Sequence, residues 1–359
     1  MKRFVGYVME ESGRPLRRVE RPMPIPGPGE ALVRVVGCGV CHTDIGYFAG
    51  GVRTRHALPL ILGHEISGYV ENAAEGFEDL VGQAVIVPAV IPCGICGPCR
   101  AGQPSVCGSQ IMPGNDSDGG FASHVIVPAR HLCVVPNATS DPDATIAGKT
   151  TLRHLSVVAD AVSTAYQSVA RSELARGEVA VVVGLGGVGG YAAQIAADRG
   201  AFVVGIDVDR ERLASAARGG KILALDASSA KPKEMRSKIQ AAAREAGAPG
   251  WSWVILECSG TAAGQTMAYG LLVPGARLMV VGYTLDTVTL RLSNLMAFDA
   301  RAIGNWGCAP DHYPAILDLV LDGRIDVVSQ TVLRPLDSVN QVLADVQAHG
   351  VRGRVVLAP

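Results

Sequence analysis

Four chemically active side chains stand next to one another in the stretch GCGVCHTD, namely Cys41, His42, Thr43 and Asp44. A thiol, an imidazole, a hydroxyl and a carboxylate are groups that bind metals or move protons, and packing gives no reason to place them together. A single cysteine could equally belong to a disulfide or lie in a satisfied polar turn. The interpretation therefore depends on partners elsewhere in the chain.

A second stretch, PCGICGPCRAGQPSVC, brings four cysteines close together at positions Cys93, Cys96, Cys99 and Cys107. The spacing C-x2-C-x2-C-x7-C, with Gly and Pro between, lets four thiolates surround one tetrahedral Zn²⁺. An iron–sulfur cluster is the alternative, but the fourth cysteine falls at the wrong distance for the ferredoxin pattern. We predict a structural zinc that holds a surface lobe. The remaining cysteines lie in apolar contexts and are expected to be buried as small hydrophobic residues: Cys38, Cys133, Cys258 and Cys308.

A glycine-rich motif, VAVVVGLGGVGG, follows a predicted strand and opens a predicted helix. Its G-x-G-x-x-G spacing is made by Gly184, Gly186, Gly187, Val188 and Gly189. Such glycines let the backbone approach a pyrophosphate at the positive end of the helix. Asp207 ends the next predicted strand, where a carboxylate accepts hydrogen bonds from ribose hydroxyls and repels a 2′-phosphate. The motif favours NAD over NADP, although Arg210 could accommodate the phosphate.

The stretch around Cys41 finds a partner in LPLILGHEISG, which offers His64 with Glu65 beside it. A catalytic zinc needs three protein ligands and one open position. Gly and Pro around both stretches predict loops at strand ends, where sites are usually built. His64 alone would read as an ordinary buried histidine. Its occurrence with Cys41, the four-cysteine stretch and the dinucleotide motif favours a metal ligand.

Composition agrees with an α/β enzyme. The 359 residues suffice for two domains, and they are 48% hydrophobic and 18% charged, with 43 glycines. The net charge of −1 gives no field that favours nucleic acid or an anionic membrane. The N-terminus lacks an apolar signal core, and glycines and charges interrupt the most apolar region, 179–206. We expect a cytoplasmic protein without a membrane span, in which clustered cysteines bind metal rather than form disulfides.

The hydrophobic pattern divides the chain in two. Residues 1–135 contain short strands separated by Gly/Pro turns, an all-β pattern typical of a barrel. From about residue 175, apolar strands alternate with helices, which predicts a parallel, doubly wound sheet. The predicted strands here are 178–184, 201–207, 253–260 and 276–282, and the predicted helices are 187–200, 210–220 and 233–247. A further helix over 313–323 and a last strand over 354–359 carry no motif of their own.

In this order, GCGVCHTD, GHE, the four-cysteine lobe and GLGGVG resemble the zinc-dependent medium-chain alcohol dehydrogenase family over essentially the whole chain. The resemblance implies an enzyme that oxidises CH–OH with NAD as acceptor and holds two Zn²⁺ per chain. It also implies a GroES-like catalytic domain over residues 1–160 and 306–359 and a Rossmann NAD-binding domain over 161–305. The third catalytic ligand, often a cysteine, falls on Asp160 in SVVADAVSTAY, and related branches use an acid there. A helix cap or linker acid is the alternative for Asp160.

The resemblance further implies roles for single residues. Thr43 passes the alcohol proton toward the nicotinamide ribose. Glu65 adjusts the zinc coordination from beside the ligands, without being a ligand itself. Contacts with NAD are implied for His42 and Arg354 at the pyrophosphate and for Arg212 at the adenosine ribose. Many members have a histidine five residues after the catalytic cysteine to deliver the proton to solvent. Gly46 occupies that position here, so water or another group has to complete the relay.

Several longer stretches, among them IMPGNDSDGGFASHV and LSNLMAFDARAIGNWGC, resemble a branch of the family that oxidises the ring alcohol of a cyclohexene-carbonyl-CoA thioester during anaerobic aromatic degradation. In GGVRTRHALP, the basic side chains of Arg53, Arg55 and His56 could meet CoA phosphates. Solvated surface arginines are the alternative, and Lys149 and Arg153 are further candidates. The family forms dimers or tetramers, so we expect a homo-oligomer.

Three other functions stay open from the sequence. The first is a dehydrogenase of the same family for a polyol, an amino alcohol or a simple cyclic alcohol. The second is a zinc-dependent hydratase that adds water across the conjugated enone with help from Glu65. The third is a non-catalytic NAD-binding sensor, which the combination of Cys41, His64 and Asp160 disfavours.

Overall fold

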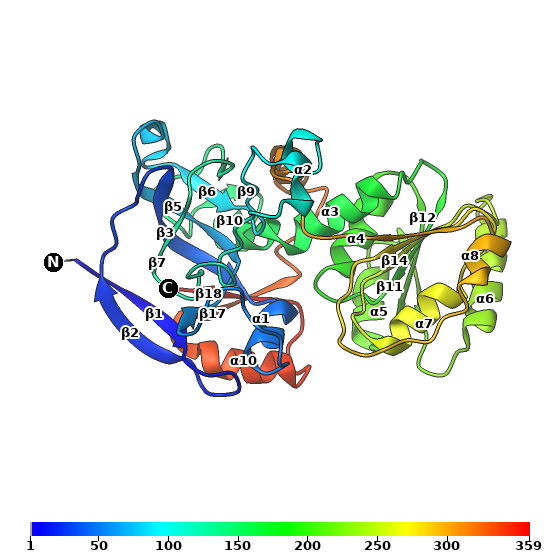
Figure 1. Cartoon of the computed structure of the whole chain (residues 1–359). Helices are drawn as coiled ribbons and strands as arrows, with labels where there is room; N and C mark the ends of the chain where they lie inside the picture. The colour runs from blue at the N-terminus through cyan, green and yellow to red at the C-terminus, as the bar shows by residue number, and fades with distance from the viewer. Residues whose placement is uncertain (1) are drawn as a thin grey trace. The chain divides into compact units, whose positions relative to one another are not determined.

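The computed structural model describes residues 2–359, which form two compact units. Unit 1 combines the chain up to Ser163 with Gly307–Pro359, and unit 2 spans Thr164–Trp306. Unit 1 is thus built from both ends of the chain (Figure 1). Between residues 2 and 359, no helix has the length and apolar character that a bilayer crossing requires.

The strands of unit 1 form a seven-stranded sheet, a three-stranded sheet and a small hairpin. The strands of the large sheet are β3 (Glu30–Gly39), β5 (Glu65–Ala73), β6 (Ala84–Val87), β7 (His124–Pro128), β8 (Cys133–Val134), β17 (Thr331–Pro335) and β18 (Arg354–Ala358). The other strands are β1 (Arg3–Met9), β2 (Arg17–Pro22), β4 (Leu60–Ile61), β9 (Thr145–Ala147) and β10 (Thr150–Thr151). The large sheet runs in the order β17-β18-β3-β5-β6-β8, and β7 pairs with β3. Strand β3 therefore pairs with β5, β7 and β18 and lies at the centre of this sheet.

The C-terminal segment closes unit 1. β18 pairs antiparallel with β3, with Val356 opposite Gly39. The helices of unit 1 are α1 (His42–Phe48), α2 (Gly97–Arg100), α9 (Tyr313–Leu321) and α10 (Val339–Gln347). Short 3₁₀ turns are η1 (Glu78–Leu80), η2 (Pro104–Val106), η3 (His154–Ala159), η4 (Pro310–His312) and η5 (Leu336–Ser338). Helix α10 contacts α1, so residues from the end of the chain lie against the stretch that begins at position 42 (Figure 1).

Unit 2 is a parallel sheet covered by helices. Its strands are β11 (Val179–Val183), β12 (Phe202–Asp207), β13 (Ile222–Asp226), β14 (Val254–Glu257), β15 (Arg277–Val280) and β16 (Arg301–Gly304). Its helices are α3 (Ala161–Arg171), which starts just before the unit boundary, α4 (Gly189–Asp198), α5 (Arg210–Ala217), α6 (Pro232–Glu245), α7 (Ala262–Gly270) and α8 (Ser293–Ala297). The strands lie in the order β13-β12-β11-β14-β15-β16, and every pairing is parallel. The chain therefore builds the sheet outward from β11, first to one side and then to the other. The predicted doubly wound sheet is confirmed.

Each unit has its own apolar core, which supplies most of the driving force for folding. In unit 1, buried residues such as Val33 and Ile66 line the large sheet. In unit 2, the continuous apolar strand β11 and the fully buried Trp253 lie at the centre of the core. A strand that is buried on both faces reads as an apolar run, which is why the sequence predicts these strands correctly.

Candidate active site and metal centres

Cys41 is held at the start of helix α1, directly after strand β3. Its backbone is extended and its N–H donates a hydrogen bond to the Asp44 carboxylate at 2.8 Å. An acid in the first turn of a helix is favoured because it accepts from free N–H groups and faces the positive end of the helix dipole. This local arrangement turns the Cys41 thiol away from the strand and keeps it 8% exposed.

His64 lies between strands β4 and β5, at a turn that only glycine permits. Gly63 has a φ of +98°, and a Cβ at this position would lie 2.6 Å from a Phe121 ring carbon and 2.8 Å from Cys38 Sγ. An L side chain is disfavoured at that φ and would collide with both neighbours. The GHE stretch therefore brings the His64 ring, 1% exposed, into the interior of unit 1.

The structure brings together the side chains predicted to bind the catalytic zinc. The three predicted ligands, Cys41, His64 and Asp160, and the neighbouring Glu65 each offer one possible ligand atom, and these atoms all lie within 4.8 Å of one another. Cys41 Sγ lies 3.7 Å from Asp160 Oδ2, and His64 Nε2 lies 3.5 Å from the same oxygen. Zinc bonds of about 2.0–2.3 Å in a tetrahedron separate neighbouring ligand atoms by about 3.3–3.8 Å.

Burial supports the same assignment. Both ring nitrogens of His64 are buried, and neither makes a hydrogen bond to residues 2–359. Polar atoms are rarely left without a hydrogen bond in a protein interior, so an imidazole whose nitrogens reach carboxylate oxygens only at 3.4 and 3.5 Å, next to a thiol, fits a metal ligand. A soft thiolate, an imidazole and a carboxylate are donors that suit Zn²⁺. The residues therefore fit the predicted ion.

Asp44 orients the His64 ring from behind. His64 Nδ1 lies 3.4 Å from Asp44 Oδ1, and the same oxygen accepts the Gly63 N–H at 3.2 Å. A carboxylate behind a ligating histidine fixes its orientation and raises its basicity. Burial lowers the pKa of His64, but Asp44, Asp160 and Cys41 outweigh it and raise the pKa well above its usual value. A histidine that binds a metal has to be unprotonated, so the affinity of such a site for its metal depends on pH.

Asp44 was not among the predicted site residues, although a signal for it exists. The pattern CHTD puts an acid three residues after the residue that caps the helix, which is the spacing of a capping box. An acid at that spacing has its carboxylate directed back to the N-cap residue, here Cys41. The capping pattern would therefore have indicated that Asp44 lies near the metal ligand.

Glu65 forms a buried ion pair with Arg354, which begins the C-terminal strand. Arg354 Nη2 lies 3.1 Å from Glu65 Oε1, and Arg354 Nη1 donates to the Val40 carbonyl at 3.1 Å. Burial raises the pKa of Glu65 to about 7, although the Arg354 charge lowers it. Gly39 makes room for this carboxylate, since a Cβ there would lie 1.9 Å from Glu65 Oε2. The Arg354 guanidinium is 5% exposed and lies against Glu65 beside the candidate metal ligands, and its contact with the cofactor pyrophosphate stays a prediction.

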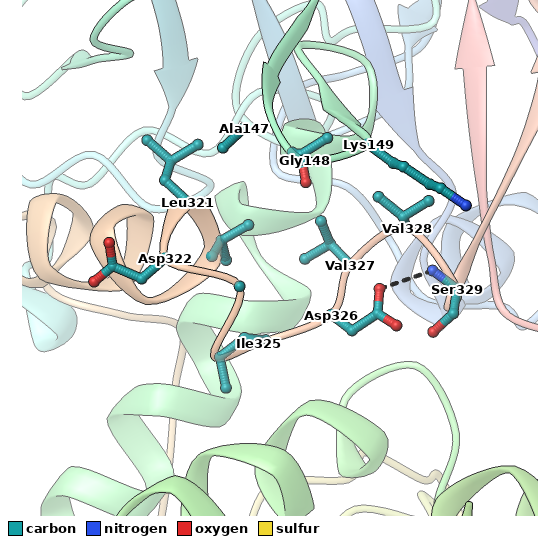
Figure 2. Close-up of a pocket in the computed structure, with 13 residues that line it drawn as sticks. Ala147, Gly148, Lys149, Leu321, Asp322, Ile325, Asp326, Val327, Val328 and Ser329 are labelled. Carbon is teal, nitrogen blue, oxygen red and sulfur yellow. Dashed lines mark hydrogen bonds between the residues drawn. The ribbon is translucent and has the colours of Figure 1, made fainter. Parts of the chain in front are cut away.

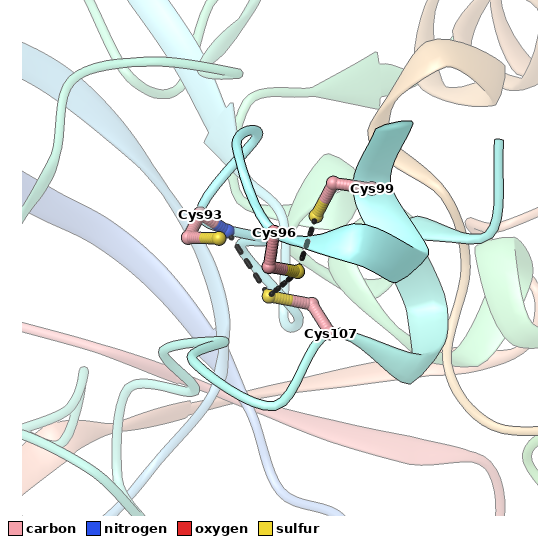
Figure 3. Close-up of side chains that lie close together, drawn as sticks. All are labelled: Cys93, Cys96, Cys99 and Cys107. Carbon is pink, nitrogen blue, oxygen red and sulfur yellow. Dashed lines mark hydrogen bonds between the residues drawn. The ribbon is translucent and has the colours of Figure 1, made fainter. Parts of the chain in front are cut away.

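The four-cysteine lobe is a second candidate metal centre (Figure 3). Cys96 Sγ lies 3.4 Å from Cys99 Sγ and 3.6 Å from Cys107 Sγ, near the separation of about 3.8 Å that tetrahedral Zn–S bonds give. The Cys93 thiol has its pKa lowered to about 6, mainly by the backbone N–H groups of Ile95 and Cys96. The remaining cysteines are buried, apart from Cys258, which is half-buried.

The glycine-rich loop of unit 2 has the form that a dinucleotide requires. Gly184 has a φ of +88°, and a Cβ there would lie 2.6 Å from the Ser259 Cα. A Cβ on Gly189, the first residue of α4, would lie 1.8 Å from the Gly184 carbonyl oxygen. At Gly186 the nearest atom to a Cβ is Arg212 Nη1 at 3.7 Å, so the space beside the loop is open. Gly184 therefore allows the tight turn, Gly189 allows the helix to pack closely on the loop, and Gly186 leaves room for the ligand to approach.

Asp207 ties this loop to the end of strand β12. Its carboxylate accepts the Leu185 N–H at 2.7 Å and the N–H groups of Val208 and Asp209 at 2.7 and 2.9 Å. Arg212 Nη1 lies 3.8 Å from Asp207 Oδ2. The predicted ribose acid and its arginine neighbour are therefore adjacent at the carboxyl end of the sheet.

The other predicted cofactor and relay residues lie on helix α1. Thr43 Oγ1 lies 3.6 Å from Cys41 Sγ, close enough to serve a substrate oxygen near the thiol. The His42 ring is exposed and stacks on His349, with ring centroids 6.0 Å apart. Gly46 lies in the same helix, so the relay histidine that many members of the resembled family have at this position is absent, as the sequence shows.

The predicted substrate residues have different environments. Arg53 and Arg55 are exposed, and their loop is anchored by Asn115, whose side chain accepts the Arg55 N–H at 3.0 Å. Arg153 is engaged elsewhere, with Asp143 at 2.6 Å and the Val36 carbonyl.

Lys149 lines a groove of about 560 Å³ between the β9–β10 hairpin and the segment after α9 (Figure 2). The groove is apolar at its base, with Val320, Ile325 and Val327, and it is open to solvent. Asp326 closes one end, where its carboxylate accepts the Ser329 N–H at 3.0 Å. The groove does not contain any of the metal-ligand candidates.

A β-rich unit with two sets of zinc ligands and a unit with a dinucleotide-binding loop define a zinc-dependent medium-chain dehydrogenase. Two family models match the chain: the alcohol dehydrogenase GroES-like domain over residues 27–137 and zinc-binding dehydrogenase over residues 187–322. The zinc-type alcohol dehydrogenase-like protein YphC of Escherichia coli is 30% identical over 84% of this chain and 83% of its own length. An alcohol dehydrogenase of Geobacillus stearothermophilus is 28% identical over 98% of both chains.

Solved structures agree. The alcohol dehydrogenase of Aeropyrum pernix superimposes with a TM-score of 0.86 at 29% identity, covering 99% of this chain and all of the other. The thermostable alcohol dehydrogenase of Pyrobaculum aerophilum, solved with cobalt and zinc, gives 0.82 at 26% identity over both whole chains. This chain belongs to the zinc-dependent medium-chain alcohol dehydrogenase family. It is an oxidoreductase that acts on CH–OH, with zinc and a nicotinamide dinucleotide as cofactors.

Proposed function

We propose that this enzyme oxidises a secondary ring alcohol to a ketone with NAD, and that its substrate is 6-hydroxycyclohex-1-ene-1-carbonyl-CoA, which gives the 6-oxo product. The observation that supports this reaction is that the possible ligand atoms of Cys41, His64 and Asp160 lie close together. The substrate rests on the stretches that resemble 6-hydroxycyclohex-1-ene-1-carbonyl-CoA dehydrogenase of anaerobic benzoyl-CoA degradation.

The side chains divide the work of the reaction. Cys41, His64 and Asp160 would hold the catalytic zinc, and the four cysteines from Cys93 to Cys107 the structural one. When bound, zinc supplies a Lewis acid for the alcohol oxygen and NAD supplies the hydride acceptor. Two anionic ligands would offset the ion's +2 charge and the neutral imidazole would add none. Because a carboxylate donates less electron density than a thiolate, the zinc would stay a good Lewis acid.

Thr43 would carry the alcohol proton away. A hydroxyl both accepts and donates a hydrogen bond, so it can take the proton from the substrate and pass another onward. Because Gly46 has no side chain, water or another group has to accept the proton next. Glu65 stays beside the metal ligands, and Arg354 balances its charge there.

Asp207 would select NAD. Its carboxylate has three N–H partners and keeps lone-pair capacity for a ribose hydroxyl. A 2′-phosphate beside this carboxylate would be repelled, which disfavours NADP. His42 and Arg212 are the residues that we assign to the pyrophosphate and to the adenosine ribose.

Arg53 and Arg55 are our candidates for contacts with the CoA phosphates. The Arg55 N–H is held by Asn115, which belongs to the motif IMPGNDSDGG. Arg55 also pairs with Asp116 at 3.4 Å. A fixed loop with exposed guanidinium groups suits a phosphate, because little conformational entropy is lost on binding.

A homo-oligomer is also part of the proposal. Strand β16 lies at the edge of the parallel sheet and leaves backbone hydrogen-bonding groups unpaired. Apolar side chains nearby in the chain are exposed, such as Leu292 and Met296. Light scattering on the purified protein distinguishes a dimer or tetramer from a monomer.

A substrate comparison tests the function. NADH formation should be fastest with the hydroxycyclohexene-carbonyl-CoA thioester, slower with free cyclohex-2-enol and absent with the Cys41→Ala variant, which should still bind NADH. Turnover that favours sorbitol or another polyol would replace the substrate assignment, and relatives named sorbitol dehydrogenase and L-galactonate-5-dehydrogenase match the chain at 27% and 26% identity. A water adduct of the enone formed without net NADH would indicate a hydratase. Wild-type rates in Cys41→Ala would end the proposal.

A further inference from the structure

The carbonyl oxygen of Ala159, directly before Asp160, is the meeting point of three separate segments. The Tyr313 hydroxyl donates to it in a short hydrogen bond. The Ala89 N–H, from the segment after β6, donates to it at 3.2 Å. Ser163 Oγ, from the first turn of α3, lies 3.2 Å from the same oxygen. A carbonyl oxygen has two lone pairs, so these neighbours leave it fully engaged.

Ser163 and Tyr313 form one buried hydrogen-bonded unit. Ser163 Oγ lies 3.2 Å from Ala159 O, from Asp160 O and from Tyr313 Oη, so its single proton can go to any of the three. Tyr313 is 1% exposed and Ser163 is 1% exposed. Burial raises the pKa of Tyr313 well above its usual value, so the phenol remains a donor at all ordinary pH values.

The backbone at Asp160 needs such support because no regular element continues through it. The 3₁₀ turn η3 ends at Ala159, and Asp160 itself has φ −138° and ψ −61°, outside the helical region. Helix α3 then begins at Ala161. The Asp160 side chain is short, so a shift of its peptide moves the carboxylate almost as far. The contacts of 3.5 and 3.7 Å to His64 and Cys41 depend on this peptide.

We propose that Tyr313 and Ser163 are positioning residues for the catalytic metal, because they fix the Ala159–Asp160 peptide and thereby place the Asp160 carboxylate opposite Cys41 and His64. The inference rests on the proposed role of Asp160 as a ligand. Tyr313, from the start of helix α9, would then act on the site through the Ala159 carbonyl rather than by binding the metal itself.

The Tyr313→Phe variant, loaded with Co²⁺ in place of zinc, tests this role. The variant removes one hydroxyl and keeps the ring. We expect the catalytic site to bind Co²⁺ about 10- to 100-fold more weakly in competition with a chelator, the usual effect of losing an outer partner of a ligand. We also expect the visible Co²⁺ spectrum of that site to change, because it reports ligand geometry. The metal held by the four cysteines should keep its affinity.

Tyr69→Phe is the matched control. Tyr69 is also buried, and its hydroxyl donates to a backbone carbonyl, that of Thr139, at 2.6 Å. A loss of stability common to both variants would therefore be a general effect of removing a buried tyrosine hydroxyl. Only Tyr313→Phe should alter the Co²⁺ spectrum and lower kcat while the KM for NAD stays unchanged.

Ser163→Ala supplies a second measurement, since it removes the other side-chain donor and keeps helix α3. It should change the Co²⁺ spectrum in the same direction as Tyr313→Phe, and this result supports the inference even if Tyr313→Phe does not fold. Folded variants with wild-type Co²⁺ affinity and spectrum would overturn it. A wild-type protein that oxidises no alcohol, together with altered spectra in both variants, would overturn the proposed function and leave this inference standing.

Discussion

The change of Asp44 to asparagine isolates the charge behind His64. Asp44 is completely buried and its carboxylate faces three donors: the Cys41 N–H at 2.8 Å, the Gly63 N–H at 3.2 Å and the His64 Nδ1 at 3.4 Å. Asparagine has the same shape but a single acceptor oxygen. Its NH₂ group would have to face one of these donors, so at least one hydrogen bond is lost along with the charge.

The magnitudes follow from these contacts. One hydrogen bond to a charged group contributes about 1.5–3 kcal/mol, and we expect a loss of that size in the free energy of unfolding of the metal-free protein. The affinity of the catalytic site for zinc should fall about 10- to 100-fold, equivalent to about 1.4–2.8 kcal/mol. The His64 ring would then lack the fixed orientation and basicity that Asp44 gives it.

Urea unfolding and a zinc competition titration with a chromophoric chelator measure the two effects. The four-cysteine site serves as an internal reference, because it should retain its ion in the variant. Asp118→Asn is the matched control: Asp118 also accepts a backbone N–H, from Ile61 at 2.9 Å, and faces no metal-ligand candidate. A folded Asp44→Asn protein that binds both ions as tightly as the wild type would refute the reasoning.

Three further predictions concern other parts of the molecule. Arg354→Met should lower the free energy of unfolding by about 3–5 kcal/mol, because the buried Glu65 loses its counter-charge; urea unfolding measures it, and adding Glu65→Gln should restore part of the loss. Asp207→Gly should reduce the preference for NADH over NADPH about tenfold, equivalent to about 1.4 kcal/mol of charge repulsion; fluorescence titration checks this, and an unchanged preference would remove Asp207 from the role. Burial lowers the pKa of His154, whose Nδ1 accepts the Thr151 N–H at 3.2 Å; the unfolded chain therefore takes up a proton near pH 6.5 that the folded chain refuses, and the contribution of His154 to stability should fall as the pH drops from about 7.5 to 5.5. His154→Gln should flatten that dependence, and equal slopes would contradict it.

The parts of the fold that the sequence predicts are those with continuous apolar runs. Strand β11 reads VAVVV and is buried at every position, so no surface pattern obscures it. The edge strands of the same sheet were not predicted. Strand β13 reads ILALD, a run of only four apolar residues that stays half-buried, and β16 reads RAIG, is mostly exposed and shows neither an apolar run nor a clear alternation. Their pairing is decided by the neighbouring strand rather than by their own residues.

The same distinction applies to the site. Cys41 and His64 stand out by residue type, because thiols and imidazoles beside glycine turns are uncommon. Asp160 is a lone acid 119 positions from Cys41, and only the family resemblance indicated it. Tyr313 gave no signal, since its contact with Ala159 joins residues 154 positions apart. Residues that act by holding a backbone cannot be recognised until the chain has folded.

The ion pair between Arg354 and Glu65 has a consequence for biosynthesis. Arg354 follows the other residues of the metal pocket, Cys41, His64, Glu65 and Asp160, in the sequence and belongs to β18, so it leaves the ribosome after all of them. Until then, a nascent chain holds the Glu65 carboxylate without the cation that balances it. The metal pocket is therefore complete only after the segment that carries Arg354 has been made and has paired with β3.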